Sequence, residues 1–246
     1  MQWHFADVFE SISARIPERT ALVHGDRRRC WREFEDRSAR LAAALAAAGL
    51  GPGAKVAIYG LNSNEFMEGH FAVFKLRGQP FNVNYRYVEH ELRYLFDNAD
   101  TEAVIFDARF GPQLDRIRPH LPALRLLIEI DDGSGKHLPD SRGYEELIAV
   151  HGRLPRQDYA ETDVYMFYTG GTTGMPKGVM YPHGDFTRGL AEAVLWPKLT
   201  ASASRCSVRL VTTVPPWASA AKPPSHSPVP CIRGQATRLT GAVAFA

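Results

Sequence analysis

The residues best suited to chemistry lie in one short run, from Tyr168 to Gly178. It holds glycines at four positions, threonines at three and a single lysine, Lys177. Glycine lets backbone N–H groups close around an anion, threonine hydroxyls add short donors, and lysine adds a mobile positive charge. This combination predicts a loop that binds the phosphates of a nucleotide.

The run differs from a Walker A loop, in which a glycine is followed directly by lysine and then serine or threonine. Here Met175 and Pro176 separate Gly174 from Lys177, and Gly178 follows the lysine. A flexible Gly/Thr linker is the alternative. A linker rarely places proline and lysine inside such a run, between an apolar strand and a helical segment, so we favour the phosphate loop.

The elements expected around this loop alternate between strands and helices. Strands alternating with helices of this length imply parallel βαβ units with right-handed crossovers. The glycine cluster at 49–53 follows a helix, so we interpret it as a helix end and turn and not as a dinucleotide loop. Strands are expected at 55–59, 80–83, 102–106, 124–130 and 164–168, a hairpin at 21–31, and helices at 5–16, 34–45, 62–76, 89–97, 113–120 and 144–150.

The composition of the sequence argues against several classes of protein. A net charge of +2 by itself gives no indication of a nucleic-acid or membrane partner. The three cysteines show neither disulfide nor zinc spacing, so neither a disulfide framework nor a zinc site is indicated and no residue is assigned as a metal ligand. No uncharged apolar run reaches the ~18–20 residues of a membrane span, and the N-terminus lacks the pattern of a signal peptide. We therefore expect a cytoplasmic protein.

The last fifth of the sequence differs from the rest. Residues 193–246 contain six Lys or Arg and no Asp or Glu, and 7 of the 17 prolines follow Trp196. Its proline and serine content predicts a disordered tail over 197–246. Because disordered tails usually retain some carboxylates, we hypothesise that this tail is translated out of frame. A genuine basic linker is the alternative.

At the loop, the sequence from Tyr168 to Met180 resembles the phosphate-binding motif of the adenylate-forming enzymes, which include acyl-CoA synthetases, luciferases and peptide-synthetase adenylation domains. Gly170 stands where the usual motif has serine, which resembles the fatty-acyl or sterol-side-chain CoA ligases. The resemblance extends from about Phe5 to Trp196. Upstream it is carried by residues 56–62, 74–78, 82–86 and 91–94.

The resemblance implies an α/β fold over residues 1–196, the first half of a large N-terminal domain with mostly parallel sheets flanked by helices. It implies that ATP and a fatty or other apolar carboxylate give an acyl-adenylate, and that CoA then gives the thioester, with Mg2+ as the metal. Gly170, Gly171 and Gly174 would let the backbone approach the β- and γ-phosphates. Hydroxyls would come from Thr169, Thr172 and Thr173, and Lys177 would offset charge on pyrophosphate.

His183 matches a family histidine beside the acyl carboxylate and adenylate. A histidine at a turn or helix start is the alternative.

Other family motifs are not found in this sequence. There is no Tyr-Gly-x-Thr-Glu for adenine and magnesium, no later Thr-Gly-Asp for the ribose, and no C-terminal domain with its lysine. Since one stabilising donor is typically worth ~10²–10³ in rate, we expect this chain to be weakly active or inactive as a ligase. The alternative function is a non-catalytic remnant that binds nucleotide weakly or serves as an interaction module.

Overall fold

The computed structural model of the chain describes residues 3–169 and 175–191. The chain divides into two compact units, Met1–Gly189 and Leu190–Ala246. All of the described helices and strands begin in the first unit. The predicted boundary at residue 196 and the predicted tail at 197–246 lie outside the described residues.

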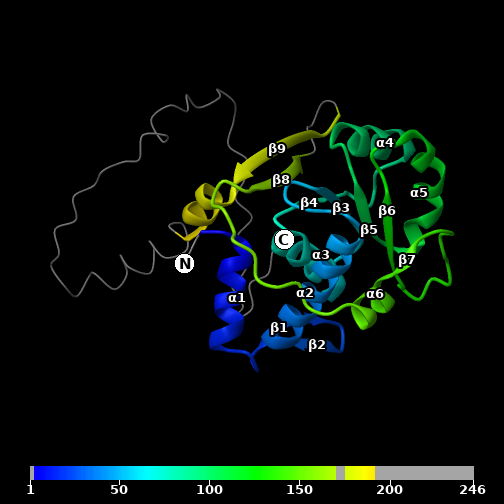
Figure 1. Cartoon of the computed structure of the whole chain (residues 1–246). Coiled ribbons are helices and arrows are strands. Elements are labelled where there is room, and N and C mark those ends of the chain that lie inside the picture. The colour runs from blue at the N-terminus through cyan, green and yellow to red at the C-terminus, as the bar shows by residue number, and fades with distance from the viewer. Residues whose placement is uncertain (1–2, 170–174, 192–246) are drawn as a thin grey trace, which may run out of the picture. The chain divides into compact units, whose positions relative to one another are not determined.

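A five-stranded parallel sheet forms the centre of this first unit (Figure 1). Its three inner strands are buried on both faces, as is usual for parallel sheets covered by crossover helices. In spatial order the strands are β4 (Gln79–Asn82), β3 (Lys55–Tyr59), β5 (Ala103–Asp107), β6 (Leu126–Ile130) and β7 (Arg142–Gly143).

The alternation of side chains along β3 divides the core into two layers. Val56 and Ile58 pack with α2 (Trp31–Ala47), α3 (Asn64–Lys75) and α6 (Tyr144–Val150) on one face. Ala57 and Tyr59 pack with α4 (Glu89–Asn98) and α5 (Gly111–Ile117) on the other. Helices therefore cover both faces, which confirms the predicted α/β class.

A third cluster joins the N-terminal helix to this body. Phe5 of α1 (Phe5–Arg15) packs with Phe34, Phe71 and Phe74 of α2 and α3. The antiparallel hairpin of β1 (Thr20–His24) and β2 (Arg27–Cys30) lies between α1 and α2 in the sequence. The predicted hairpin and N-terminal helix are both present.

Most expected elements are found within one or two residues of their predicted bounds. The turn at the end of α2 is confirmed, since Gly49 and Gly53 have φ of 83° and 79°, where glycine is favoured. Upstream of the loop, the elements that were not expected are β7 and the 3₁₀ turn η1 (Ala108–Phe110). The end of the helix expected at 113–120 is the 3₁₀ turn η2 (Arg118–His120).

One expectation near the loop is wrong. The residues after it form a strand, β9 (Lys177–Pro182), antiparallel to β8 (Val164–Thr169), and not a helix. Val179 and Tyr181 are residue types that favour strands, and pairing with β8 satisfies the backbone groups of this segment. Residues 183–191 are helical, so the helix begins six residues later than Lys177.

Candidate functional site

The hairpin of β8 and β9 holds both ends of the predicted phosphate loop. Thr169 ends β8, Lys177 begins β9, and the two are cross-strand partners. Since the Cα atoms of such partners are about 4.5–5.5 Å apart, the segment between them starts and finishes at nearly one point. The Lys177 side chain is exposed. The other predicted phosphate contacts, Gly170, Gly171, Thr172, Thr173 and Gly174, lie outside the described residues.

Tyr168 connects this hairpin to the central sheet and to α4. Its hydroxyl donates to Oδ1 of Asn98 at 2.9 Å, and its ring centroid lies 5.5 Å from that of Phe81. Burial raises the pKa of Tyr168 to about 12, so the hydroxyl stays protonated and able to donate. Across the ladder, a Cβ at Gly178 would lie 3.1 Å from the Tyr168 ring. Glycine at 178 therefore leaves room for this ring.

His183 lies just beyond β9 and is completely buried. Its Nδ1 accepts the backbone N–H of Phe5 at 3.3 Å, and its ring stacks on His4 with centroids 3.9 Å apart. Phe74 meets it edge-on at 5.0 Å. Burial, followed by the neighbouring His4, lowers the pKa of His183 to about 3. The ring is therefore neutral, with its proton on Nε2.

His4 is the second member of this stacked pair and the N-cap of α1. Its Nδ1 accepts the N–H of Ala6 at 3.1 Å, its ring stacks on Tyr159 at 4.8 Å, and its Nε2 lies 3.6 Å from Oδ2 of Asp163. Burial lowers the pKa of His4 to about 4, against the opposing effect of Asp163. Two neutral imidazoles thus join α1 to the base of the β8–β9 hairpin.

Asp163, directly before β8, fixes the start of that strand. It accepts two hydrogen bonds from Arg77, at 2.8 and 2.9 Å, and its backbone carbonyl accepts the N–H of His183 at 2.8 Å. Burial acts to raise the pKa of Asp163, but the hydrogen bonds from Arg77 and Ala160 outweigh it and the pKa is lowered. Arg77 holds a φ of 62°, an uncommon backbone conformation for a residue with a side chain.

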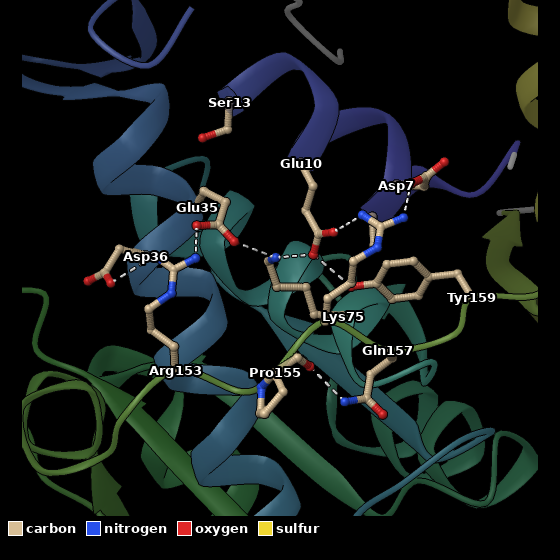
Figure 2. Close-up of polar contacts among 12 residues, drawn as sticks. Asp7, Glu10, Ser13, Glu35, Asp36, Lys75, Arg153, Pro155, Gln157 and Tyr159 are labelled. Atoms are coloured by element: carbon tan, nitrogen blue, oxygen red, sulfur yellow. Dashed lines mark hydrogen bonds and ion pairs between the residues drawn. The ribbon is translucent and has the colours of Figure 1, made fainter. Parts of the chain in front are cut away.

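A segment that we call the strap, residues 151–163, leads from α6 to β8 and is fastened by ion pairs (Figure 2). Arg153 of the strap pairs with Glu35 and Asp36 of α2. Arg156 pairs with Asp7 and Glu10 of α1. The strap is therefore held against two helices on its way to the loop hairpin.

Lys75 is the centre of this network (Figure 2). Its Nζ lies 2.5 Å from Oε1 of Glu10 and 2.7 Å from Oε1 of Glu35, and its side chain is only 6% exposed. Tyr159 adds a hydrogen bond from its hydroxyl to Oε1 of Glu10, at 2.7 Å. One buried ammonium group thus links α3 to α1 and α2, beneath the strap.

The structure does not bring Lys177 and His183 into one cluster. They flank opposite ends of the six-residue β9, and a strand rises about 3.3 Å per residue, which separates them by about 20 Å. The predicted contact of His183 with an acyl carboxylate stays a prediction. What is observed is a histidine at a helix start, packed among aromatic rings.

Metal and membrane features were searched among the described residues only. There, no group of three or more His, Cys, Asp or Glu side chains is placed to hold a metal ion. In the same part of the chain, no helix is long and apolar enough to cross a bilayer.

Several residues of this region escaped the sequence-based prediction. His4 and Asp163 stand outside every motif, whereas Lys75 and Arg77 lie in residues 74–78, which carry the family resemblance without giving either residue a role. Only the fold brings the four together, so the sequence did not indicate their contacts. Arg77 is the exception, since the adjacent Gly78 is a sequence signal for a tight turn. In the structure, a Cβ at Gly78 would lie 2.8 Å from Val73, so the chain needs glycine there.

Comparison with known proteins places the chain in a family. Residues 9–220 match the family described as AMP-binding enzyme. A 3-oxocholest-4-en-26-oate--CoA ligase of Rhodococcus rhodochrous is 39% identical over 197 residues, covering 79% of this chain and 36% of that protein. The medium-chain acyl-CoA ligase Mig of Mycobacterium avium is 42% identical over 193 residues, covering 72% of this chain and 35% of that protein. The chain spans about a third of the length of these relatives.

Solved structures agree on the fold. The anthranilate CoA ligase AuaEII, in complex with anthranoyl-AMP, matches with a TM-score of 0.70 at 24% identity. The match covers 76% of this chain and 36% of the AuaEII chain. The N-terminal domain of FACL13 from Mycobacterium tuberculosis has a TM-score of 0.65 at 24% identity, covering 74% and 45%. With the family match across most of the chain, these findings show that it belongs to the AMP-binding enzyme family.

Proposed function

We propose that this chain carries the phosphate-binding part of an ATP-dependent ligase that joins an apolar carboxylate to CoA. The observation that supports it best is the antiparallel ladder that places Thr169 and Lys177 side by side at the two ends of a Gly/Thr segment. The printed names of the relatives, which include medium- and long-chain fatty acids and a sterol side-chain acid, support an apolar substrate.

In the proposed reaction, a carboxylate oxygen of the substrate attacks the α-phosphorus of ATP. The bond to the bridging oxygen of the β-phosphate breaks, and pyrophosphate leaves with the electron pair. The CoA thiol then attacks the acyl carbon, loses its proton and displaces AMP. Lys177 and the backbone N–H groups of the loop would stabilise the charge that develops on pyrophosphate.

The positive charge of Lys177, in the described part of this site, is suited to a negatively charged triphosphate. Lys177 is an exposed residue at the start of β9, paired across the ladder with Thr169. Magnesium would neutralise phosphate charge when bound, and the described residues hold no group of three or more His, Cys, Asp or Glu side chains placed to bind it. We therefore assign no step to residues of this chain acting through the metal.

We further propose that these 246 residues alone bind nucleotide and turn it over slowly or not at all. The sequence lacks the family motifs for adenine, ribose and the adenylation lysine. Because each lost donor lowers the rate by roughly 10²–10³, their joint absence leaves little catalysis. The second candidate, a weak nucleotide-binding or interaction module, is favoured by the same absence.

Pyrophosphate release tests both candidates. The protein would be assayed with ATP, CoA and fatty acids of increasing chain length, beside Lys177→Ala and, as a matched surface control, Lys136→Ala. Release above the Lys177→Ala level identifies a ligase. Nucleotide affinity without release identifies the binding module. If neither release nor affinity depends on Lys177, both proposals fail.

A further inference from the structure

The β1–β2 hairpin and its flanks differ in charge from the rest of the folded unit. Residues 15–32, which we call the basic hairpin, contain six arginines and two acidic residues. The remainder of residues 1–192 contains 17 basic and 25 acidic residues. A strongly positive segment therefore belongs to an otherwise negative body.

Half of these arginines keep their charge uncompensated. Arg27 pairs with Glu65, Arg32 with Glu18, and Nε of Arg29 lies 3.6 Å from Glu68. Three others, Arg15, Arg19 and Arg28, make no ion pair within the part of the chain that the structure describes. Three unpaired guanidinium groups on one short exposed segment attract anions.

The backbone of the hairpin places two of the unpaired arginines. The N–H of Trp31 donates to the carbonyl of Arg19 at 2.9 Å, which fixes the base of the hairpin, and Arg28 is the cross-strand partner of Val23 near its tip. Val23 is 53% exposed, and Ile16 at the end of α1 is 38% exposed. Aliphatic side chains thus lie exposed beside unpaired arginines.

We propose that the basic hairpin docks this protein on an anionic membrane surface. The guanidinium groups would pair with lipid phosphates, which favour arginine, while Val23 and Ile16 enter the interface. Nucleic acid or an acidic protein would satisfy the arginines but would leave the aliphatic side chains without a favourable contact. Each arginine near an anionic bilayer strengthens binding by a factor of about five.

The position of the hairpin separates this role from the proposed nucleotide site (Figure 1). The first residues of α1 contact His183, whereas its last residues lead into β1. An 11-residue helix spans about 16 Å. Docking through the basic hairpin therefore does not depend on the phosphate loop, and its failure would leave the proposed function untouched.

The test is co-sedimentation of the whole chain with phosphatidylcholine vesicles, with and without phosphatidylglycerol, at low and high salt. Binding is expected only to the anionic vesicles, and weaker at high salt. The double variant R19E/R28E should lower partitioning at least about 20-fold, and Val23→Ser about fivefold. The variant R86E/R93E, with the same change of charge before and within α4, should lose far less.

Three results would overturn the proposal. One is equal binding to neutral and anionic vesicles. Another is an equal loss in R19E/R28E and R86E/R93E, which would mean that net charge alone matters. The third is a loss on R205Q/R209Q but not on R19E/R28E, which would assign binding to residues 193–246. If DNA or polyglutamate binds through Arg19 and Arg28 while vesicles do not, the surface serves an acidic macromolecule and the membrane proposal is wrong.

Discussion

At the end of β3, Gly60 leaves room for the carboxylate of Asp107. A Cβ at this position would lie 2.8 Å from Oδ1 of that side chain. Asp107 is buried, accepts the N–H of Leu61 at 2.8 Å, and has a pKa that burial raises. Any side chain at position 60 would push a buried acid away from this donor.

Gly60→Ala should therefore lower the free energy of unfolding by about 1–3 kcal/mol, the usual cost of a disturbed buried hydrogen bond. Gly51→Ala is the matched control, since no heavy atom lies within 4 Å of its added Cβ. Urea unfolding of the two variants measures the difference. Equal stabilities would show that Asp107 can move without cost.

The stacked histidines predict how stability depends on pH. Their folded pKa values, about 4 for His4 and about 3 for His183, lie below the ordinary 6.5. Between pH 6.5 and 4 the unfolded chain therefore binds more protons than the folded one, and stability falls as the pH falls. The contribution of the neutral rings is complete above pH 6.5.

We expect the free energy of unfolding to decrease by about 2–4 kcal/mol between pH 7 and pH 5. His183→Phe removes one of three histidines whose pKa burial lowers, beside His4 and His70, and should reduce this pH dependence by about a third, whereas the exposed His90→Gln should leave it unchanged. Urea unfolding at the two pH values gives the slope. An unaltered slope in His183→Phe would exclude the stacked pair as its source.

At the scale of elements, the strap and its ion pairs hold the route into the loop hairpin. Removing Lys75 leaves Glu10 and Glu35 facing each other in a partly buried setting, with side chains 14% and 15% exposed. Breaking such a pair costs more than breaking an exposed one, because two partly buried carboxylates are left close together, with only Arg156 and Arg153 of the strap, among the described residues, to pair with them.

Lys75→Met should destabilise the protein by about 2–4 kcal/mol. Arg116→Met, which breaks an ion pair that is 55% exposed on both sides, should cost less than about 1 kcal/mol. Thermal unfolding and urea unfolding both report this difference. A small effect of Lys75→Met would mean that apolar packing, and not the ion network, fastens the strap.

Sequence reasoning worked best where the pattern of side chains is local. The buried strand 55–59 and the helix 144–150 were predicted with the bounds that the structure has, because each is a continuous apolar or amphipathic run. Sequence reasoning was wrong at β9, because Gly178 and Pro182 interrupt the pattern of side chains typical of a strand. There, pairing with β8 decides the conformation. Long-range pairing is not visible in a window of ten residues.

At the scale of the whole molecule, the family and the fold class could be predicted from the loop and the alternation of elements. The cluster around His4 could not, because its members come from segments up to about 180 residues apart, as in the contact of Phe5 with His183. The match to AMP-binding enzymes covers residues 9–220, while the chain spans about a third of its relatives. The function of this chain is therefore tested best at the phosphate loop, which the chain contains.

The loop between Thr169 and Lys177 is proposed to bind the phosphates of ATP. Isothermal titration of the whole chain with ATP tests it directly, with Lys177→Ala and Lys136→Ala as paired variants. A charge-assisted contact to phosphate is worth about 1.5–3 kcal/mol, so Lys177→Ala should weaken ATP binding by roughly 10- to 100-fold while Lys136→Ala binds as the parent does. Equal ATP affinity in the parent and Lys177→Ala, or no affinity in the parent, would contradict this claim.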